Sequence, residues 1–570
     1  MTNAIIPTPI LSQAERATQM FPTLTPAQIG RIAVHGRWRV VRRGEVLVEA
    51  GAEIVTFFVV TKGAVEIVMA ARDGGEPVIV YKPGQFTGDI QLLWGRRSVL
   101  RTRATEDAEV IELDRNQMLV VVQTDGELSE IIIRAYILRR VELIARGIGD
   151  VVLIGSRYCA ETLRVKEFLT RNGHPFSYVD VNEDSHVQEL LDHIHVSLTN
   201  VPVLVCRGDT VLRKPTNYQI AECLGFNTSV DNNVVHDVVV VGAGPAGLAA
   251  AMYAASEGLN VLVVESKAPG GQAGSSSKIE NYLGFPTGIS GLSLAHRAYN
   301  QAQKFGAQVI IGQNATRLGC DRKPYTIELD NGLRVPTRTV VIATGAEYRR
   351  LSLDNLTHLE GAGIYYAATF MEAQLCADQE VIVIGGGNSA GQAAIFLAQS
   401  VERVHMVIRS GGLAASMSSY LIRRIEDTPN IVLHMHTELV SLTGDLHLES
   451  VSLRNNQNGD IEHNNIRHVF CMSGGIPSTH WLTGEVACDK NGFIKTGPAL
   501  SQEELMKAQW PLGRLPHLLE TSVPGVFAVG DVRANGIKRV ASAVGEGSIA
   551  ISFVHEVLRE ETEHMHAEFS

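Results

Sequence analysis

Two glycine-rich turns constrain the fold of this chain more than any other feature of its 570 residues. The first follows a valine-rich run, residues 236–241, and the second follows an equally apolar run, residues 380–384. In each case a stretch that can form a helix comes directly after the glycines. A buried strand, a tight glycine turn and a helix present free N–H groups and the positive end of the helix dipole to a pyrophosphate. The sequence therefore predicts two related α/β dinucleotide-binding domains.

The first turn reads Gly-Ala-Gly-Pro-Ala-Gly and leads into a helix. Its first glycine is needed for a tight bend, its second lets a pyrophosphate approach the backbone, and its third lets the helix pack closely on the strand. The chain then returns through an apolar strand that ends in an acid, which can accept hydrogen bonds from a ribose. Nucleotide contacts are therefore predicted at Gly242, Gly244, Pro245, Ala246, Gly247 and Glu265.

Further motifs give the first turn a specific context. Pro-Gly-Gly-Gln at 269–272, Glu-Asn-Tyr at 280–282, Ala-Thr-Gly at 343–345 and Val-Gly-Asp at 529–531 follow one another in that order. Over residues 235–555 this order resembles the thioredoxin reductase family. The resemblance implies FAD, with an aspartate on the ribityl chain and a helix beginning near Gly545 whose N-terminus points at the flavin. The flavin contacts it implies are Gly271, Gln272, Asn281, Thr344, Gly345, Gly530, Asp531, Arg539 and Val540, the last being a departure because many relatives have glutamine there.

The second turn predicts a nicotinamide dinucleotide. It comprises Gly385, Gly387, Asn388, Ser389 and Ala390, and alanine is accepted at the third small position because that residue only has to pack closely. In the resembling family the next strand ends in an arginine cluster for the NADP 2′-phosphate, of which only Arg409 remains in register. Because a cation and no acid follows the strand, NADPH is favoured and NADH stays possible. Arg423 and Arg424, a helix later, either contribute or form a solvated helix face.

The dithiol of the resembling family is missing. That family has Cys-x-x-Cys just before the nicotinamide strand, where this chain has Ala367 and Phe370, and no two of its seven cysteines have that spacing. Disulfide exchange needs a thiolate and a resolving sulfur, which neither residue supplies. Electrons then pass either through the middle of the chain or directly to an external acceptor, as in ferredoxin–NADP reductases of thioredoxin-reductase type.

Residues 148–229 resemble glutaredoxin. A strand at 151–154 precedes Cys159, which opens a helix, and Pro202 matches the cis-proline of the thioredoxin fold. A thiol at a helix N-terminus has a lowered pKa, and Arg157 nearby would favour the thiolate further. Thr162 stands where a second cysteine would be, so only monothiol chemistry is possible. Cys159 is thus either a redox residue or a replaceable residue in a docking domain.

Residues 1–147 predict a small β-barrel followed by helices. Gly51, Lys62-Gly63 and Gly88-Asp89 resemble the cyclic-nucleotide-binding domain, but the arginine that holds the cyclic phosphate in that family falls on Ser98. The flanking Arg96, Arg97 and Arg101 could substitute for it, although strand alternation would turn some of them outward. A bound cyclic nucleotide is therefore doubted, and the alternative is a dimer or docking surface.

Composition excludes other classes of function. The formal net charge is −11 and the only Arg-rich stretch lies near residue 100, which argues against nucleic acid as a partner. The most apolar stretch, 131–154, is interrupted by arginines and a glutamate, so it does not span a membrane. A cytoplasmic location follows, and relatives are commonly homodimers. The predicted multidomain fold has a barrel domain at 1–147, a thioredoxin-like α/β domain at 148–229, FAD-binding parts at 230–347 and 473–570, and an NAD(P)H domain at 348–472.

The predicted function is that of an FAD-dependent NAD(P)H oxidoreductase. Its acceptor would be a thioredoxin-like or other thiol/disulfide partner, or Cys159 itself. One alternative is a flavin-containing redox or ligand sensor regulated through the barrel. Another is electron transfer to ferredoxin or flavodoxin, which expects a basic docking face that the acidic net charge does not encourage.

Overall fold

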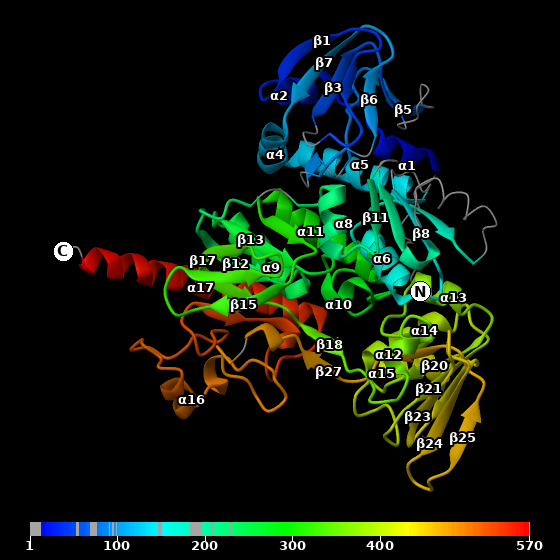
Figure 1. The fold of residues 1–570 in the computed structure, drawn as a ribbon. Helices are drawn as coiled ribbons and strands as arrows, with labels where there is room; N and C mark the ends of the chain where they lie inside the picture. Colours follow the sequence, from blue (N-terminus) through cyan, green and yellow to red (C-terminus); the bar gives the residue numbers. More distant parts are fainter. Residues whose placement is uncertain are drawn as a thin grey trace, which may run out of the picture.

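The structure is a computed structural model, and it describes residues 13–52, 56–68, 77–89, 92–93, 96–98, 100–145, 151–182, 197–206, 210–227, 230–482 and 484–568. The ribbon runs from an N-terminal barrel through a middle domain to two nucleotide-binding domains (Figure 1). The predicted boundaries at 147/148 and at 229 lie outside the described residues.

The barrel domain (described residues 13–145) closes two antiparallel sheets, ordered β1-β7-β3 and β2-β6-β4-β5, over an apolar interior that includes Phe58, Val60 and Tyr81. Helices follow the sheets, as the sequence predicted, and two further helices precede them, which it did not predict. The elements are α1 (Gln13–Met20), α2 (Pro26–Ala33), β1 (Arg37–Val41), β2 (Val46–Val48), β3 (Phe57–Lys62), β4 (Val65–Val68), β5 (Pro77–Tyr81), β6 (Arg101–Ala104), β7 (Ala108–Leu113), α4 (Arg115–Thr124) and α5 (Gly126–Ala145).

The middle domain (described residues 151–227) is a four-stranded sheet in the order β11-β10-β8-β9, in which β8 and β9 are parallel and β10 is antiparallel to β8 and β11. The Val201–Pro202 peptide is cis, as predicted. The elements are β8 (Val151–Gly155), α6 (Ala160–Arg171), β9 (Ser177–Asp180), η1 (Leu198–Asn200), β10 (Val203–Cys206), β11 (Thr210–Arg213) and α8 (Asn217–Leu224).

The first nucleotide domain (230–347 and 473–568) is built on a sheet ordered β14-β13-β12-β17-β16-β15, with β28 beside β17. Strands β14, β13, β12, β17 and β28 are parallel, so their carboxyl ends meet at one edge, where this class of fold binds its ligands. The elements are β12 (His236–Val241), α9 (Pro245–Ser256), β13 (Val261–Glu265), α10 (Gly271–Gly274), α11 (Gly291–Lys304), β14 (Gln308–Ile311), β15 (Ala315–Gly319), β16 (Tyr325–Leu329), β17 (Arg334–Ile342), η2 (His480–Leu482), η3 (Gly497–Ala499), α16 (Gln502–Lys507), β28 (Val526–Ala528), η4 (Gly530–Val532) and α17 (Val540–Glu568).

The second nucleotide domain (348–472) has a parallel sheet, β19-β26-β20-β21-β22, covered on one side by an antiparallel sheet of β23, β24 and β25. The chain enters and leaves it through paired strands β18 and β27, which lie between the two domains (Figure 1). The two connecting strands are β18 (Ala346–Tyr348) and β27 (Gly475–Pro477). The elements of the domain are α12 (Leu356–Leu359), β19 (Ile364–Tyr365), α13 (Phe370–Leu375), β20 (Glu380–Ile384), α14 (Asn388–Leu397), β21 (Arg403–Val407), α15 (Ser419–Glu426), β22 (Ile431–His434), β23 (Thr437–Thr443), β24 (Ser450–Asn455), β25 (Ile461–Asn464) and β26 (Val469–Cys471).

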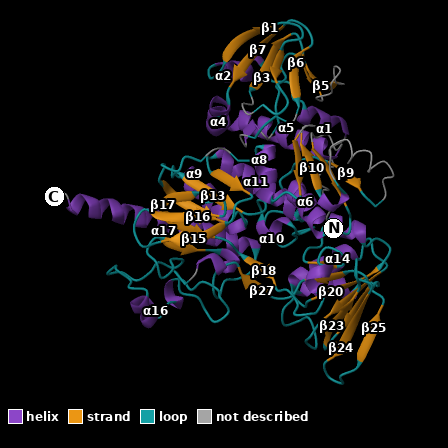
Figure 2. Ribbon diagram, in the orientation of Figure 1, coloured by secondary structure: helices purple, strands orange, loops and turns teal. Residues whose placement is uncertain are grey.

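The middle domain touches the barrel domain and both nucleotide domains (Figure 2). The first turn of α6 packs on the second nucleotide domain, where a Cβ added at Gly361 would lie 2.6 Å from the Cα of Ala160. The rings of Tyr158 and His447 are 6.0 Å apart between centroids. Among the described residues, no helix is both long enough and apolar enough to cross a membrane.

Candidate functional site

The first glycine turn has the geometry that the sequence predicted. Gly242 has φ +103°, and a Cβ there would overlap the carbonyl of Ala343. A Cβ at Gly247 would overlap the carbonyl oxygen of Gly242, so this glycine lets α9 pack directly on the turn. At Gly244 the nearest atom to an added Cβ is the Cα of Gly271, 3.8 Å away. The turn therefore leaves its backbone open at the one glycine that a pyrophosphate has to approach.

Glu265 is buried at the end of β13 and is held by the backbone. Its carboxylate accepts hydrogen bonds from the N–H of Ala243 at 2.7 Å, of Lys267 at 2.8 Å and of Ala268 at 3.2 Å. Two carboxylate oxygens offer about four acceptor positions, so roughly one remains for a ribose hydroxyl. The acid thus organises the turn as well as standing where a ribose would bind, and the sequence predicted only the second role.

The returning chain brings Gly530 and Asp531 to the same turn. A Cβ added at Gly530 would lie 3.0 Å from the Cβ of Ala246 in the first turn of α9. The carboxylate of Asp531 accepts no hydrogen bond from the part of the chain that the structure describes. Burial raises the pKa of Asp531, opposed by the nearby Lys538 and reinforced by Glu546. A desolvated acid without a donor suits a ligand that brings hydroxyl donors, such as a ribityl chain.

Glu546 was not found from the sequence. Its carboxylate accepts a hydrogen bond from the N–H of Gly530 at 2.7 Å and pairs with Arg533. It therefore fixes the loop that carries Asp531. Its position directly after Gly545 was a signal, because the helix near Gly545 was already predicted to point at the flavin.

The last helix begins earlier than predicted. Helix α17 starts at Val540, so the expectation of a start near Gly545 was wrong, and the two glycines lie inside the helix. Gly547 is required there because a Cβ would overlap the carbonyl of Ala246 where α17 crosses α9. Val540 and Pro245 both line an apolar cleft of about 380 Å³ between α9, α11 and α17.

The remaining predicted flavin residues fall into three groups. Thr344 donates a hydrogen bond to the carbonyl of Ser478 at 2.8 Å, and Gly345 accepts one from the N–H of Ser478 at 3.1 Å, so both join the outgoing and returning chains. Gly271 lies against Gly244, as described above. Gln272, Asn281 and Arg539 are exposed, and their side chains make no hydrogen bond to the residues described.

The second turn follows the same plan. A Cβ at Gly385 would lie 2.8 Å from the carbonyl oxygen of Met472 and 3.1 Å from the Cβ of Ala390, which is fully buried. The alanine therefore packs as the third small residue should. The side chain of Asn388 accepts a hydrogen bond from the N–H of Ser418 at 2.8 Å, while Ser389 and Gly387 stay accessible.

Arg409 stands beside this turn. It follows Ile408, whose methyl group would lie 3.4 Å from a Cβ at Gly386, and its side chain is exposed with no ion pair to any described residue. Arg424, in contrast, pairs with Glu280 of the first nucleotide domain. Arg409 is therefore the cation that remains available at the second turn, and Arg424 joins the two domains.

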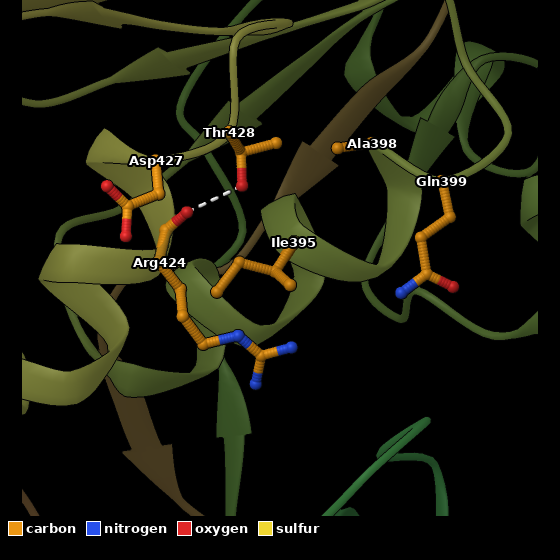
Figure 3. Close-up of a pocket in the computed structure, with 6 residues that line it drawn as sticks. All are labelled: Ile395, Ala398, Gln399, Arg424, Asp427 and Thr428. Atoms are coloured by element: carbon orange, nitrogen blue, oxygen red, sulfur yellow. Dashed lines mark hydrogen bonds between the residues drawn. The ribbon is translucent and has the colours of Figure 1, made fainter.

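A depression of about 330 Å³ on the second nucleotide domain is lined by Ile395, Ala398, Gln399, Arg424, Asp427 and Thr428 (Figure 3). In this depression the hydroxyl of Thr428 donates to the carbonyl of Arg424 at 2.5 Å. It lies at the C-terminal ends of α14 and α15, whereas the glycine turn precedes the N-terminus of α14. A helix of this length separates the two by roughly 15 Å, so the depression is not the dinucleotide site.

Cys159 is the N-cap residue of α6, half-buried and without a side-chain capping bond. Arg157 is engaged by Asp180, with Nε 2.7 Å from the carboxylate, instead of standing only beside the thiol. Thr162 is fully buried under Gly155. Cys376, the cysteine nearest in sequence to Ala367 and Phe370, is buried, and burial raises its pKa to about 12. Of these two cysteines, only Cys159 is partly exposed.

The arginines that flank Ser98 in the barrel domain all have contacts of their own. Arg96 is buried between domains, donating to the carbonyl of Asn172 at 2.9 Å and lying 4.1 Å above the ring of Phe226. Arg97 packs against Gly225, and Arg101 pairs with Glu49 at 2.8 Å. The hydroxyl of Ser98 donates to the carbonyl of Leu100. Each of the three arginines that could substitute for the phosphate-binding arginine is therefore engaged elsewhere.

Side chains of the barrel domain itself also occupy the region around Gly88 and Asp89, which resembles the cyclic-nucleotide site. Arg139 of α5 donates to the carbonyls of Met20 at 2.9 Å and Gly88 at 2.8 Å, and its guanidinium lies 4.7 Å from the ring centroid of Phe86. Arg140 pairs with Asp89, the residue that resembles the ribose-binding acid, at 3.5 Å. These contacts give a physical reason to doubt that the barrel domain binds a cyclic nucleotide.

A family model of pyridine nucleotide-disulphide oxidoreductases matches residues 236–547, more than half of the chain. The chain belongs to this family. The oxidoreductase also matches models of the cyclic nucleotide-binding domain at 38–125 and of glutaredoxin at 151–211. These matches confirm the predicted multidomain fold.

Curated relatives of the oxidoreductase include two thioredoxin reductases. That of Ureaplasma parvum serovar 3 is 33% identical over 330 residues, covering 57% of this chain and 98% of the relative. That of Treponema pallidum is 33% identical over 315 residues, covering 55% and 94%. Among solved structures, Lactococcus lactis thioredoxin reductase in its FR conformation is similar with a TM-score of 0.51 and 26% identity, covering 57% of this chain and 99% of that one. The thioredoxin reductase of T. acidophilum has a TM-score of 0.50 and 28% identity over the same shares.

The oxidoreductase is thus an FAD-containing NAD(P)H enzyme of thioredoxin-reductase type. Its residues fit the flavin nucleotide: an open backbone at Gly244, an acid at Glu265 with an acceptor position left, and a desolvated acid at Asp531. Which residues contact the cofactors remains a prediction.

Proposed function

We propose that this oxidoreductase takes two electrons from NADPH and passes them, through FAD, to an acceptor other than a dithiol of its own. The observation that carries the proposal is the combination of two intact dinucleotide turns with the absence of any Cys-x-x-Cys from the sequence. Ala367 and Phe370, at the positions that resemble the dithiol, offer no sulfur.

The chain's own residues divide the work of binding. Bound FAD would supply the two-electron chemistry. The backbone N–H groups that follow Pro245 at the N-terminus of α9 would hold the pyrophosphate, Glu265 would accept from a ribose, and Asp531 would accept from the ribityl hydroxyls. Glu546 holds the Asp531 loop through Gly530. No side-chain acid or base is needed for the electron transfer itself, so these residues are cofactor cradles.

NADPH rather than NADH is supported by the exposed Arg409 after β21, where no acid stands to accept from a ribose 2′-hydroxyl. A guanidinium can pair with a 2′-phosphate through two parallel hydrogen bonds.

The acceptor that the geometry favours is a disulfide formed at Cys159 or carried by a thioredoxin-like partner. Cys159 is the half-buried N-cap residue of α6, and the next residue packs on the second nucleotide domain. Reduction of one disulfide takes two electrons and two protons and yields two thiols, so each turnover would consume one NADPH. With Cys159 in a mixed disulfide, the products are its thiol and the released partner thiol.

The test is an anaerobic titration of the purified protein with NADPH, following flavin absorbance and counting reducing equivalents. Bleaching after one two-electron equivalent per FAD means an external acceptor. A requirement for two equivalents places a disulfide in the circuit; Cys159→Ser should then return the count to one, and Cys488→Ser, at the exposed cysteine, should not. A flavin that stays oxidised with both NADPH and NADH contradicts the proposal and favours the ligand or redox sensor.

We also infer a cytoplasmic homodimer. The apolar cleft beside α9 is lined by Tyr253, Tyr282 and Phe285, and Leu283 next to it is 94% exposed. A second copy would cover these side chains, since a stable interface buries about 800 Å² on each partner. All seven cysteines are free thiols, in keeping with a reducing compartment. Light scattering should give twice the chain mass, and Leu283→Asp should shift it toward the monomer.

A further inference from the structure

The loop that follows Glu265 is held from outside by the middle domain. Three of its carbonyls accept hydrogen bonds from side chains of that domain. Asn217 donates to Ser266 at 3.3 Å, Asn172 donates to Lys267 at 3.1 Å, and Arg171 donates through Nη2 to Gly271 at 2.7 Å. The loop of residues 266–271 therefore lies at the interface between the first nucleotide domain and the middle domain.

On its other side, this loop contacts the first glycine turn. The N–H of Gly270 donates to the carbonyl of Ala243 at 2.7 Å, and the carboxylate of Glu265 accepts from Lys267 and Ala268. Gly271 has φ +52°, and a Cβ there would lie 2.9 Å from the Cα of Gly244. The same loop thus touches the glycine that a pyrophosphate must approach on one face and the middle domain on the other.

We propose that Arg171, Asn172 and Asn217 of the middle domain are positioning residues of the FAD site, which hold residues 266–271 against the first glycine turn. The loop contains two consecutive glycines in the left-handed region, a flexible pair that has much conformational freedom to lose when it is ordered. Donors fixed from outside order the loop before the cofactor arrives, so that less of the binding free energy is spent on ordering.

Arg171 is itself firmly placed. Its side chain is 12% exposed and pairs with Glu167 at 3.0 Å. Its carbonyl is 3.0 Å from Nε2 of His296 in the first nucleotide domain. Burial lowers the pKa of His296 to about 4, so its ring is neutral at pH 7 and can donate from Nε2.

The barrel domain holds the next two residues. Arg96 donates to the carbonyl of Asn172 at 2.9 Å, and Arg140 donates to the carbonyl of Gly173 at 2.6 Å. Carbonyls at the end of a helix lack partners within it, and cations are favourable at that end of the dipole. The donors to the FAD loop are therefore fixed by contacts from two other domains, and the barrel contributes through α6 without a ligand of its own.

The test measures FAD binding in the full-length protein, without NAD(P)H or acceptor. FAD is removed, and the apoprotein is titrated with FAD while flavin fluorescence and the visible circular dichroism are followed. Arg171→Ala should raise the dissociation constant about tenfold, the effect of losing one charge-assisted hydrogen bond. Arg171→Lys should recover part of this loss, and Lys166→Ala is the matched control because that cation of α6 lies 3.4 Å from the ring centroid of Tyr178, within its own domain.

A purely structural role gives a different result. If Arg171→Ala lowers the unfolding temperature of the apoprotein and leaves FAD affinity and the flavin circular dichroism within twofold of wild type, the proposal is overturned. If that variant does not fold, Asn217→Ala decides, with an expected loss of about threefold. The inference rests on the flavin cofactor alone, so a flavin that binds normally and is not reduced by NADPH contradicts the proposed function and leaves this assignment standing.

Discussion

The two glycine turns are built alike, and what surrounds them differs. Both have a glycine whose Cβ would strike a carbonyl of a neighbouring strand, and both have a small residue packed under the helix. After the second strand of each unit, however, the first turn has Glu265 bound to three backbone N–H groups and a loop held by another domain. The second has the exposed Arg409. The shared motif therefore sets the backbone path, and the segment after the second strand sets which nucleotide is bound.

The largest effect is expected where the two turns are most alike. Gly247→Ala places a Cβ on the carbonyl oxygen of Gly242, so the turn or the helix has to move. We expect a loss of about 3 kcal/mol or more in the free energy of unfolding and a protein purified without flavin. Gly319→Ala is the control, because its Cβ would meet its nearest atom at 3.6 Å. Flavin content per chain and chemical denaturation provide the readout, and a flavin-loaded, stable Gly247→Ala would contradict the packing argument.

Replacing Asp531, the acid at the flavin turn, should change cofactor binding and protein stability in opposite directions. Burial raises the pKa of Asp531 in the folded apoprotein above its ordinary value of 3.8. The folded state then binds more protons than the unfolded state, so the contribution of Asp531 is most favourable at low pH and is lost as the pH rises through the raised value. Asp531→Asn should therefore stabilise the apoprotein at pH 7, with the difference vanishing below about pH 4, and weaken FAD binding about tenfold or more.

Thermal unfolding of the apoprotein against pH, with a separate FAD titration, measures both effects. An apoprotein that loses stability at pH 7 on this substitution would mean that the carboxylate has a protein partner.

Arg409, the cation at the second turn, should make the KM for NADPH lower than it would be without this side chain and leave the KM for NADH nearly unaffected. Arg409→Ala should raise KM for NADPH about tenfold, with KM for NADH and kcat nearly unchanged, because the lost pair acts on the 2′-phosphate in ground state and transition state alike. Arg423→Ala, one helix further and exposed, should leave both KM values unchanged. An equal rise in KM for both nucleotides would mean that Arg409 does not bind the 2′-phosphate.

The smallest effect concerns the ion pair between the two domains. Arg424 and Glu280 are partly exposed, and such pairs contribute about 0–1 kcal/mol. Arg424→Ala should leave the unfolding temperature within the scatter of repeated measurements and change the rate of flavin reduction by NADPH about twofold in stopped flow. A change in NADPH affinity instead would return Arg424 to the nucleotide site.

The sequence predicted what is local and missed what crosses between domains. Each turn directly follows its strand, and the first strand, its turn and Glu265 lie within one stretch of about 30 residues, where spacing and residue type determine the backbone. The start of α17 was misplaced by five residues because Val540 and the glycines after it carry no strong N-terminal signal. Glu546 could have been found beside its glycines.

The interdomain contacts had no such signal. Arg171 lies on the surface of its own helix by sequence pattern, and only the packed domains show that it reaches Gly271. The position of Arg96 had no such signal either. It was only one of three arginines flanking Ser98 that could substitute for the phosphate-binding arginine, and its burial comes from residues 172 and 226 of another domain.

Helix α6 makes the protein less modular than its family matches suggest. Cutting the chain in the linker before His236 would produce a fragment with the full length of a free-standing reductase. That fragment would expose the outer carbonyls of Ser266, Lys267 and Gly271 to solvent. We expect the reductase half expressed alone to be purified with little flavin and to need added FAD. The same is expected when the middle domain is exchanged for another of the same fold.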